Sequence, residues 1–348
     1  MKSFEVLLLM FLCIQTTISS VSSTNTAVVC SKAEKQALLS FKKGLKDPTN
    51  WLSSWIGEDC CTWKGVSCNN RTGHVVKAGP PFCSVGASVP YLDMSGINLS
   101  NSTDYLQVLN KLPSLRDLFL SSCELNPIHD LPAQLVNFSS LTIIDLLENN
   151  FNSLAPDWLF SIPSLVSLEL SWNSFYGPIP VGLQNMTSLK ILDLSENNFN
   201  STIPDWLYNL RSLVTLDISD NNLRGSITSV VGNLTSITRL YLWGNELEES
   251  FGNLSQLGEL YISHNSLEGE VSEVHFANLT RLKAFYASST SLILKVSSDW
   301  IPPFQLQDIQ MRSWHVGPQF PGWLQTQKSI SYLDLSSTGI SDEIPTWF

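Results

Sequence analysis

Basic residues are scarce in this sequence, and charged residues of either sign make up only 15% of it. The 348 residues include 20 Lys and Arg against 31 Asp and Glu, which gives a formal net charge of −11. A chain with this acidic balance is repelled by nucleic-acid phosphates, so the composition argues against a nucleic-acid partner. Hydrophobic residues make up 43% of the chain, which is enough for a substantial buried core.

Long hydrophobic runs are missing as well. The longest apolar stretch, residues 6–14, has nine residues, whereas a helix that spans a bilayer needs about 20. Lys2 precedes this stretch and several serines follow it, which is the pattern of a secretory signal peptide. We therefore expect residues 1–25 to be a signal peptide, and we expect no membrane span elsewhere in this sequence.

Cysteine is absent after Cys123. Cys13 lies in the expected signal peptide, and four of the other six cysteines fall within residues 30–68. Such clustering near the start of an exported chain indicates disulfides. A zinc site is the alternative, but no histidine lies among these four cysteines and export disfavours free thiolates. The six cysteines are Cys30, Cys60, Cys61, Cys68, Cys83 and Cys123.

N-glycosylation sequons, Asn-x-Ser/Thr, are frequent and agree with export. Some of them coincide with the repeat described next, so their number alone carries little weight. The candidate glycosylation sites are Asn70, Asn98, Asn101, Asn137, Asn185, Asn200, Asn233, Asn253 and Asn278.

One pattern, L-x-x-L-x-x-L-x-L-x-x-N-x-L, recurs through most of the chain. Clear copies lie at residues 165–175, 189–199 and 213–223. Marked by the asparagine position, eleven copies follow one another at intervals of 20 to 26 residues. A period of this length is the signature of a solenoid. The marked positions are Ile97, Cys123, Asn149, Asn173, Asn197, Asn221, Asn245, Asn265, Thr290, Trp314 and Thr338.

The spacing predicts how each copy folds. Alternating L-x-L makes a short strand with its leucines facing inward, and stacked copies form a parallel sheet over a continuous core. The asparagine is expected to bond backbone groups of neighbouring coils. Thr290, Trp314 and Thr338 replace it late in the array. We expect local irregularity at Trp314, because an indole cannot fit there as an amide does.

Several copies continue with G-x-I-P, as at residues 177–180. The isoleucine adds a second buried position and the proline ends strand pairing. This portion is missing between Asn245 and Asn265, which are only 20 residues apart. That coil is therefore expected to be pinched on its outer side.

The segment before the array, residues 26–75, is expected to cap the open end of the solenoid. Ser31 and Glu34 form a capping-box pattern that opens an amphipathic helix. The apolar face of this helix and the tryptophans after it are expected to cover the first coil. These residues are Ala37, Leu38, Phe41, Leu45, Trp51, Leu52, Trp55 and Trp63.

The cap motif C-x29-C-C-T-W-K-G-V-S-C, at residues 30–68, followed by this repeat resembles the plant extracellular leucine-rich-repeat family. Within that family, residues 71–77, 312–330 and 333–348 are most similar to receptor-like proteins of the ethylene-inducing-xylanase receptor type. The resemblance covers nearly all of the chain after the expected signal peptide.

The resemblance implies a twisted horseshoe with a second, smaller sheet on the G-x-I-P side. It implies disulfides that pair Cys30 with Cys60 and Cys61 with Cys68. Receptors of this type sit at the plasma membrane and bind an extracellular protein, peptide or glycan ligand. They signal through a partner receptor kinase, because they have no kinase of their own.

The expected fold is therefore an α/β solenoid, a leucine-rich-repeat horseshoe with a parallel concave sheet. A disulfide-stapled N-terminal cap at residues 26–75 precedes an array at 76–348. Relatives continue into more repeats, a C-terminal cap and a membrane anchor, whereas this sequence stops within a repeat. We therefore expect this sequence to be a truncated form. The protein is expected in the apoplast if the short form is real, and at the extracellular face of the plasma membrane if a full-length form exists. Residues 78–90, with Cys83, depart from the relatives' pattern.

The residue between the two strand leucines is expected to face the concave surface, with about 4.8 Å between adjacent strands. Four carboxylates and then three tyrosines would stack in this column. The acids match the usual L-D-L consensus of the repeat. We interpret them as exposed, similar to one another and part of the repeat, with no ligand-specific role. Aromatic residues on a concave face are typical of interfaces. The column is Phe119, Asp145, Glu169, Asp193, Asp217, Tyr241, Tyr261, Tyr286, Gln310 and Asp334. The candidate ligand-binding residues are Trp172, Tyr241, Trp243, Tyr261, His264, Tyr286 and Arg312.

No enzyme, cofactor or metal site is expected. Four similar carboxylates offer no split into acid and base, and no motif for a nucleophile, metal or phosphate site is present. The leading interpretation is the ligand-recognition region of a receptor-like protein in defence or developmental signalling.

One alternative is a soluble secreted inhibitor of cell-wall-degrading enzymes, similar to polygalacturonase-inhibiting proteins. The length fits such an inhibitor, but its C-terminal cap would need cysteines after Cys123. A truncated decoy is the third interpretation.

Overall fold

The computed structural model describes residues 29–44, 50–79, 91–100, 105–112, 114–125, 138–248 and 255–348. The expected signal peptide, Leu45 and Cys83 lie outside these ranges, as do three of the sequons. The pinch expected between Asn245 and Asn265 also falls partly outside these ranges, because that interval includes residues 249–254. No described helix is both long and apolar enough to cross a bilayer.

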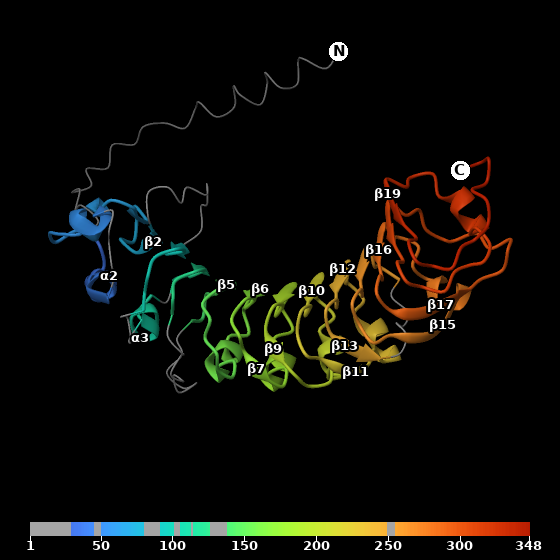
Figure 1. The fold of residues 1–348 in the computed structure, drawn as a ribbon. Helices are drawn as coiled ribbons and strands as arrows, with labels where there is room; N and C mark the ends of the chain where they lie inside the picture. The colour runs from blue at the N-terminus through green and yellow to red at the C-terminus, as the bar shows by residue number, and fades with distance from the viewer. Residues whose placement is uncertain are drawn as a thin grey trace, which may run out of the picture.

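The described residues form a curved solenoid whose inner side carries a 13-stranded sheet (Figure 1). Its first pair, β1 and β2, is antiparallel, and every later pair is parallel, as the repeat predicts. The strands in order are β1 (Val66–Cys68), β2 (Val75–Ala78), β3 (Tyr91–Asp93), β4 (Asp117–Phe119), β5 (Ile143–Asp145), β6 (Ser167–Glu169), β8 (Ile191–Asp193), β10 (Thr215–Asp217), β12 (Arg239–Tyr241), β14 (Glu259–Tyr261), β16 (Ala284–Tyr286), β18 (Asp308–Gln310) and β19 (Tyr332–Asp334).

The outer, convex side is built from short strands and single helical turns. Three two-stranded parallel sheets lie there, which matches the implied second sheet (Figure 1). They pair β7 (Tyr176–Gly177) with β9 (Asn198–Phe199), β11 (Arg224–Ser226) with β13 (Glu246–Glu248), and β15 (Glu268–Ser272) with β17 (Ser291–Lys295). The helical turns of the array are α3 (Tyr105–Leu109), η4 (Asp157–Ser161), η5 (Val181–Asn185), η6 (Leu207–Asn209), η7 (Ser229–Asn233), α4 (Glu273–Phe276) and η8 (Gly322–Thr326).

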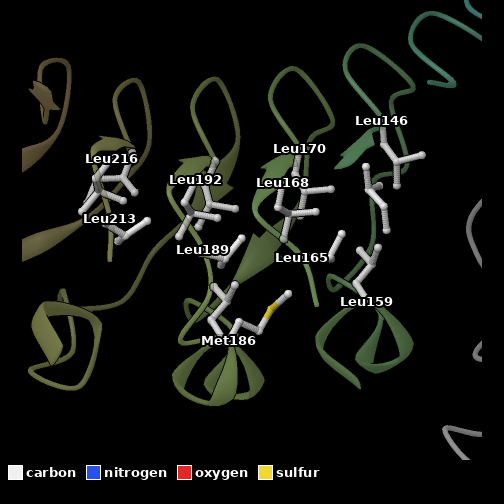
Figure 2. Packing of buried hydrophobic residues seen from close by; sticks show 14 of the residues in the cluster. Leu146, Leu159, Leu165, Leu168, Leu170, Met186, Leu189, Leu192, Leu213 and Leu216 are labelled. Atoms are coloured by element: carbon white, nitrogen blue, oxygen red, sulfur yellow. The ribbon is translucent and has the colours of Figure 1, made fainter. Parts of the chain in front are cut away.

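Leucines at equivalent positions of each coil fill the space between the two sides (Figure 2). Leu165, Leu168 and Leu170 are fully buried, and so are their equivalents in the next coil. Burial of one such side chain contributes about 1.5–3 kcal/mol. The isoleucines of G-x-I-P, such as Ile179 and Ile203, are also buried. One continuous core therefore runs along the solenoid, as the period predicts.

Asparagine side chains join the coils into a ladder. In Asn173, which is fully buried, Nδ2 lies 2.9 Å from the carbonyl oxygens of Leu146 in the preceding coil and of Leu170 and Ser171 in its own. Its Oδ1 accepts the backbone N–H of Asn149 at 2.9 Å. Equivalent bonds to the preceding coil are made by Asn149, Asn197, Asn221, Asn245 and Asn265.

The irregularity expected at Trp314 is not present. Its indole Nε1 donates to the carbonyl of Ala287 at 2.7 Å, which is the same bond to the preceding coil that the asparagines make. Trp314 is 1% exposed, and the strands on either side of it pair in register. The prediction failed because it considered the size of the indole and neglected its N–H donor.

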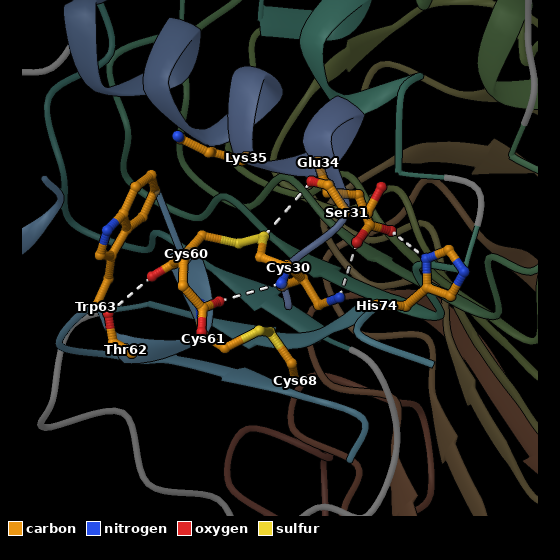
Figure 3. Close-up of a disulfide and its surroundings, with 12 residues drawn as sticks. Cys30, Ser31, Glu34, Lys35, Cys60, Cys61, Thr62, Trp63, Cys68 and His74 are labelled. Atoms are coloured by element: carbon orange, nitrogen blue, oxygen red, sulfur yellow. Dashed lines mark hydrogen bonds and ion pairs between the residues drawn. A yellow bond between two sulfur atoms is a disulfide. The ribbon is translucent and has the colours of Figure 1, made fainter. Parts of the chain in front are cut away.

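The N-terminal cap consists of α2 (Lys32–Gly44), two short turns, η1 (Trp51–Ser54) and η2 (Cys60–Thr62), and the β1–β2 hairpin. The structure pairs Cys30 with Cys60 and Cys61 with Cys68 (Figure 3). These four sulfur atoms lie within 4.8 Å of one another, and their disulfide bonds leave no thiolate among them for a metal. The buried apolar side chains predicted for the cap are those of Ala37, Leu38, Phe41, Leu52, Trp55 and Trp63.

The predicted capping box is wrong. Glu34 turns away from the helix start and is 2% exposed. Its Oε2 accepts the backbone N–H of Val75 at 2.9 Å, and its Oε1 lies 3.1 Å from Nδ1 of His74 (Figure 3). The backbone N–H that Glu34 would have capped, that of Ser31, donates to Gly73 instead. Glu34 therefore ties the helix to the hairpin.

We expect Asn173→Ala to lower the free energy of unfolding by about 3 kcal/mol, because several buried backbone groups lose their partner. The matched control is Thr290→Ala at the same repeat position, where the side chain donates one bond, to Ala287. That change should cost about 1 kcal/mol. Denaturant unfolding curves measure both values, and equal losses would contradict the role assigned to the asparagine ladder.

Candidate functional site

The strand register sets one side chain from every coil in a single line on the concave sheet. Asp145 pairs with Glu169, Glu169 with Asp193, and Asp193 with Asp217. The same alignment continues through Tyr241 and beyond to Asp334. The predicted column therefore exists in the structure, with acids in its first half and tyrosines in its second.

The sequence predicts that the four acids are exposed and similar to one another, and this prediction is wrong. Asp145, Glu169, Asp193 and Asp217 are all half-buried. Burial, followed by the charges of Asp193 and Asp145, raises the pKa of Glu169 to about 7. Burial also raises the pKa of Asp217 to about 6, against a hydrogen bond from Ser219 that lowers it. Stacking places like charges on neighbouring strands, which penalises the ionised form.

Asp334, at the other end of the column, shows the opposite behaviour. The Ser336 hydroxyl donates to its Oδ1 at 2.6 Å and the Ser336 backbone N–H at 2.9 Å. These bonds, with a smaller contribution from Arg312, lower the pKa of Asp334. One repeat position therefore holds carboxyl groups whose pKa values are shifted in opposite directions by their neighbours.

Tyr241, Tyr261 and Tyr286 form what we call the tyrosine ladder. The ring centroids of Tyr241 and Tyr261 are 4.7 Å apart, and those of Tyr261 and Tyr286 are 4.3 Å apart with the rings nearly parallel. The Tyr241 hydroxyl donates to Glu259 at 2.9 Å. Burial and this carboxylate raise the pKa of Tyr241 to about 12. Because the rings face one another, the ladder offers ring edges and hydroxyl groups to the concave side.

Three other predicted residues flank the ladder, and one does not. Trp243 follows β12, His264 follows β14 and Arg312 follows β18, so all three border the tyrosines. Trp172 follows β6, three strands from Tyr241 and thus about 14 Å away. Trp172 and His264 share the left-handed turn position of the repeat, with φ of 56° and 53°. Trp172 is 58% exposed, so it is an exposed aromatic residue that is separate from the tyrosines.

A cleft of about 650 Å³ opens at the edge of the sheet beside the ladder. Arg239, Arg281 and Lys283 line it together with Glu259 and Gly258. None of these was singled out from the sequence. The signal lay in three basic residues at the starts of two strands, β12 and β16, within a chain that has few basic residues.

The sequon asparagines differ in how exposed they are. Asn70, Asn185, Asn200 and Asn278 are exposed, whereas Asn98 and Asn233 are half-buried. The other three, Asn101, Asn137 and Asn253, lie outside the described residues. Glycosylation at each of the nine stays a prediction.

We expect Glu169→Gln to stabilise the protein at pH 8 and to leave its stability at pH 4 unchanged. The folded-state pKa of about 7 lies above the ordinary glutamate pKa of 4.5, so the native protein loses stability as the pH rises between these values. Glutamine remains neutral and escapes this loss, which we put at about 1 kcal/mol after allowing for solvent screening. Thermal melts at both pH values measure it.

Asp334→Asn is the matched control from the same column. Because the folded-state pKa of Asp334 is lowered, its removal should destabilise the protein at pH 8. If both substitutions shift the melting temperature in the same direction, the opposing pKa shifts described above are wrong.

Comparison with known proteins agrees with this architecture. Residues 168–343 match the family model for a leucine-rich repeat region, and residues 31–69 match that for a leucine-rich-repeat N-terminal domain. Receptor-like protein EIX1 of Solanum lycopersicum is 27% identical across 92% of this chain and 51% of its own length. Receptor-like protein 15 of Arabidopsis thaliana is 33% identical across 91% of this chain and 37% of its own length.

The solved structures show the same fold. The ectodomain of the Arabidopsis thaliana receptor kinase GASSHO1/SCHENGEN3, in complex with CASPARIAN STRIP INTEGRITY FACTOR 2, has a TM-score of 0.69 at 25% identity. The alignment covers 90% of this chain and 42% of that one. The plant peptide hormone receptor RGFR1, in complex with RGF2, has a TM-score of 0.65 at 22% identity, over 80% and 49% of the two chains.

The chain spans about half the length of the first two receptor-like proteins it matches, 51% and 53%. The repeats, the N-terminal cap and the relatives of this chain all indicate the same family. The chain belongs to the leucine-rich-repeat family, among the plant receptor-like proteins.

Proposed function

We propose that this chain is the extracellular ligand-recognition region of a plant receptor-like protein that acts in defence or developmental signalling. It binds a protein or peptide ligand on its concave face, and a separate partner kinase carries the signal into the cell. The observation that carries the proposal is the tyrosine ladder, which lies on the concave sheet with its three rings packed against one another.

The concave face suits recognition because it is rigid before a ligand arrives. Each tyrosine lies on a strand whose register is fixed on both sides, and the ring stacking restricts side-chain rotation further. A preorganised aromatic surface loses little conformational entropy on binding, which is the main reason that such surfaces bind well. Tyrosines also supply hydrogen bonds along with apolar area.

Signalling by this route needs a partner kinase. The described residues form a cap and a stack of coils, which supply a binding surface. The relatives are receptor-like proteins, and the neighbouring ectodomains belong to receptors. This similarity supports a role at the outer face of the plasma membrane.

Site-specific photo-cross-linking tests which face binds. A photoreactive phenylalanine analogue replaces Tyr261 in a chain secreted by plant cells, and the covalent adducts are identified by mass spectrometry. We expect adducts with a secreted protein or peptide. The matched control places the same analogue at Val181, which is 63% exposed on the convex turn η5, and should give none.

Adducts that form at Val181 and not at Tyr261 would contradict the proposal that the concave face binds the ligand. Adducts at Tyr261 that consist of a cell-wall-degrading enzyme would instead favour the inhibitor interpretation. Co-purification of a receptor kinase with the secreted chain tests the signalling part separately.

A further inference from the structure

The cleft beside the tyrosine ladder collects positive charge in a protein that has little of it. Its lining includes three cations, Arg239, Arg281 and Lys283, against one acid, Glu259. In the chain as a whole, acids outnumber bases by 31 to 20. We call this lining the basic cleft.

The charges in the basic cleft are not neutralised within the described part of the chain. The guanidinium of Arg239 donates from Nε and Nη2 to the neutral Oγ1 of Thr215, at 3.1 and 2.9 Å. Arg281 and Lys283 are exposed and form no ion pair with a described carboxylate. Basic residues of the outer sheets behave differently, since Arg224 pairs with Glu246 at 2.8 Å.

One wall of the basic cleft is apolar and fixed. It is formed by Pro302, Pro303 and Phe304. The Phe304 side chain is buried and packs on Phe276 and Trp300, with ring centroids 5.8 and 6.2 Å away. A wall held in this way excludes water from one side of the cleft, so a charged contact there is stronger than on an open surface.

The space itself comes from a glycine. Gly258 occupies the repeat position that Lys283 fills in the next coil. A Cβ atom at Gly258 would meet only ordinary contacts, 3.4 Å from the Thr238 carbonyl oxygen and 3.9 Å from that of Arg281. The missing side chain therefore leaves a hollow where the cations converge.

The cleft and the ladder form one continuous surface. Arg239 lies two residues before Tyr241 on β12, and Glu259 lies two residues before Tyr261 on β14. Side chains two apart on a strand point to the same face. Anything that reaches the basic cleft from the concave side therefore passes the tyrosine ladder.

We propose that the basic cleft binds carboxylates of a peptide ligand while the tyrosine ladder contacts the adjoining peptide segment. This deepens the proposed function and rests on it. Arginine and lysine are the natural partners of a carboxylate, and arginine binds it through two parallel hydrogen bonds.

A peptide fits better than an acidic glycan. Sugars stack on open aromatic ring faces, but Tyr286 stacks on Tyr261 at 4.3 Å with the rings nearly parallel, and Tyr241 packs on Tyr261 at 4.7 Å. What the ladder offers is its ring edges, which carry partial positive charge. These edges match the carbonyl oxygens of a peptide backbone.

Four fluorescent probes test the proposal on the secreted chain with its glycans in place. Hexaglutamate amide carries only side-chain carboxylates, hexaglutamine acid carries only a terminal carboxylate, and hexaglutamine amide carries neither. Hexagalacturonate is the acidic glycan. We expect one or both carboxylate peptides to bind, the neutral peptide not to bind, and added salt to weaken the interaction. Which of the two peptides binds identifies the source of the carboxylate.

Three variants locate the binding. Arg281→Gln combined with Lys283→Gln should weaken peptide binding at least tenfold. Lys190→Gln, a change at the repeat position of Lys283 but just before β8, should leave peptide binding unchanged. Gly258→Met fills the hollow without altering the charge and should also abolish binding. Denaturation midpoints confirm that each variant is folded.

Several results would overturn the proposal. They are binding of hexagalacturonate in preference to both peptides, equal weakening by Lys190→Gln, or no binding of either carboxylate peptide. Cross-linking at Tyr261 separates this inference from the proposed function. If capture persists at full yield in the Arg281→Gln, Lys283→Gln chain, the basic cleft is not the site and the receptor function stands.

Discussion

Each coil of this protein must stay in register with the next, and one hydrogen-bonding position holds that register. A three-residue strand makes few bonds to its neighbours, and the turn after it buries backbone carbonyls that need partners. The asparagine supplies them in its own coil and in the preceding one. Two of the residues that replace asparagine keep a donor to the preceding coil: Cys123 Sγ bonds the Met94 carbonyl, and Trp314 Nε1 bonds that of Ala287. Thr290 and Thr338 instead bond carbonyls of their own coils. Burial raises the pKa of the Cys123 thiol to about 12, so it keeps the proton that it donates.

Because register is fixed, residues at one repeat position accumulate into columns, and each column takes its character from its neighbours. Burial and two flanking carboxylates raise the pKa of Glu169, whereas hydrogen bonds from Ser336 lower the pKa of Asp334. Tyrosines in the same column pack against one another, and this contact restricts the rotation of their rings. The solenoid thus converts a short repeat into a long and rigid surface whose chemistry changes along its length.

Periodic features could be predicted from the sequence, because stacking turns sequence spacing directly into spatial position. The sheet, the buried leucines, the asparagine bonds and the concave column all follow from the period. Features that depend on contacts between unlike segments could not. Glu34 binds a hairpin 41 residues away, and the basic cleft needs a glycine from one coil beside cations from two others. The half-burial of the acids depends on neighbouring coils in the same way.

Glu259 joins the two parts of the proposed binding surface. It accepts the Tyr241 hydroxyl at 2.9 Å, which fixes the first ring of the ladder, and it lines the basic cleft next to the strand that carries Arg239. A carboxylate at this junction repels acidic groups that approach the ladder and leaves the cations beyond it as their favourable position. The ligand's acidic and neutral segments would therefore be placed in a fixed order along the concave face. The discrimination comes from one repelling charge among three attracting ones, held by strands that the asparagine ladder keeps in register.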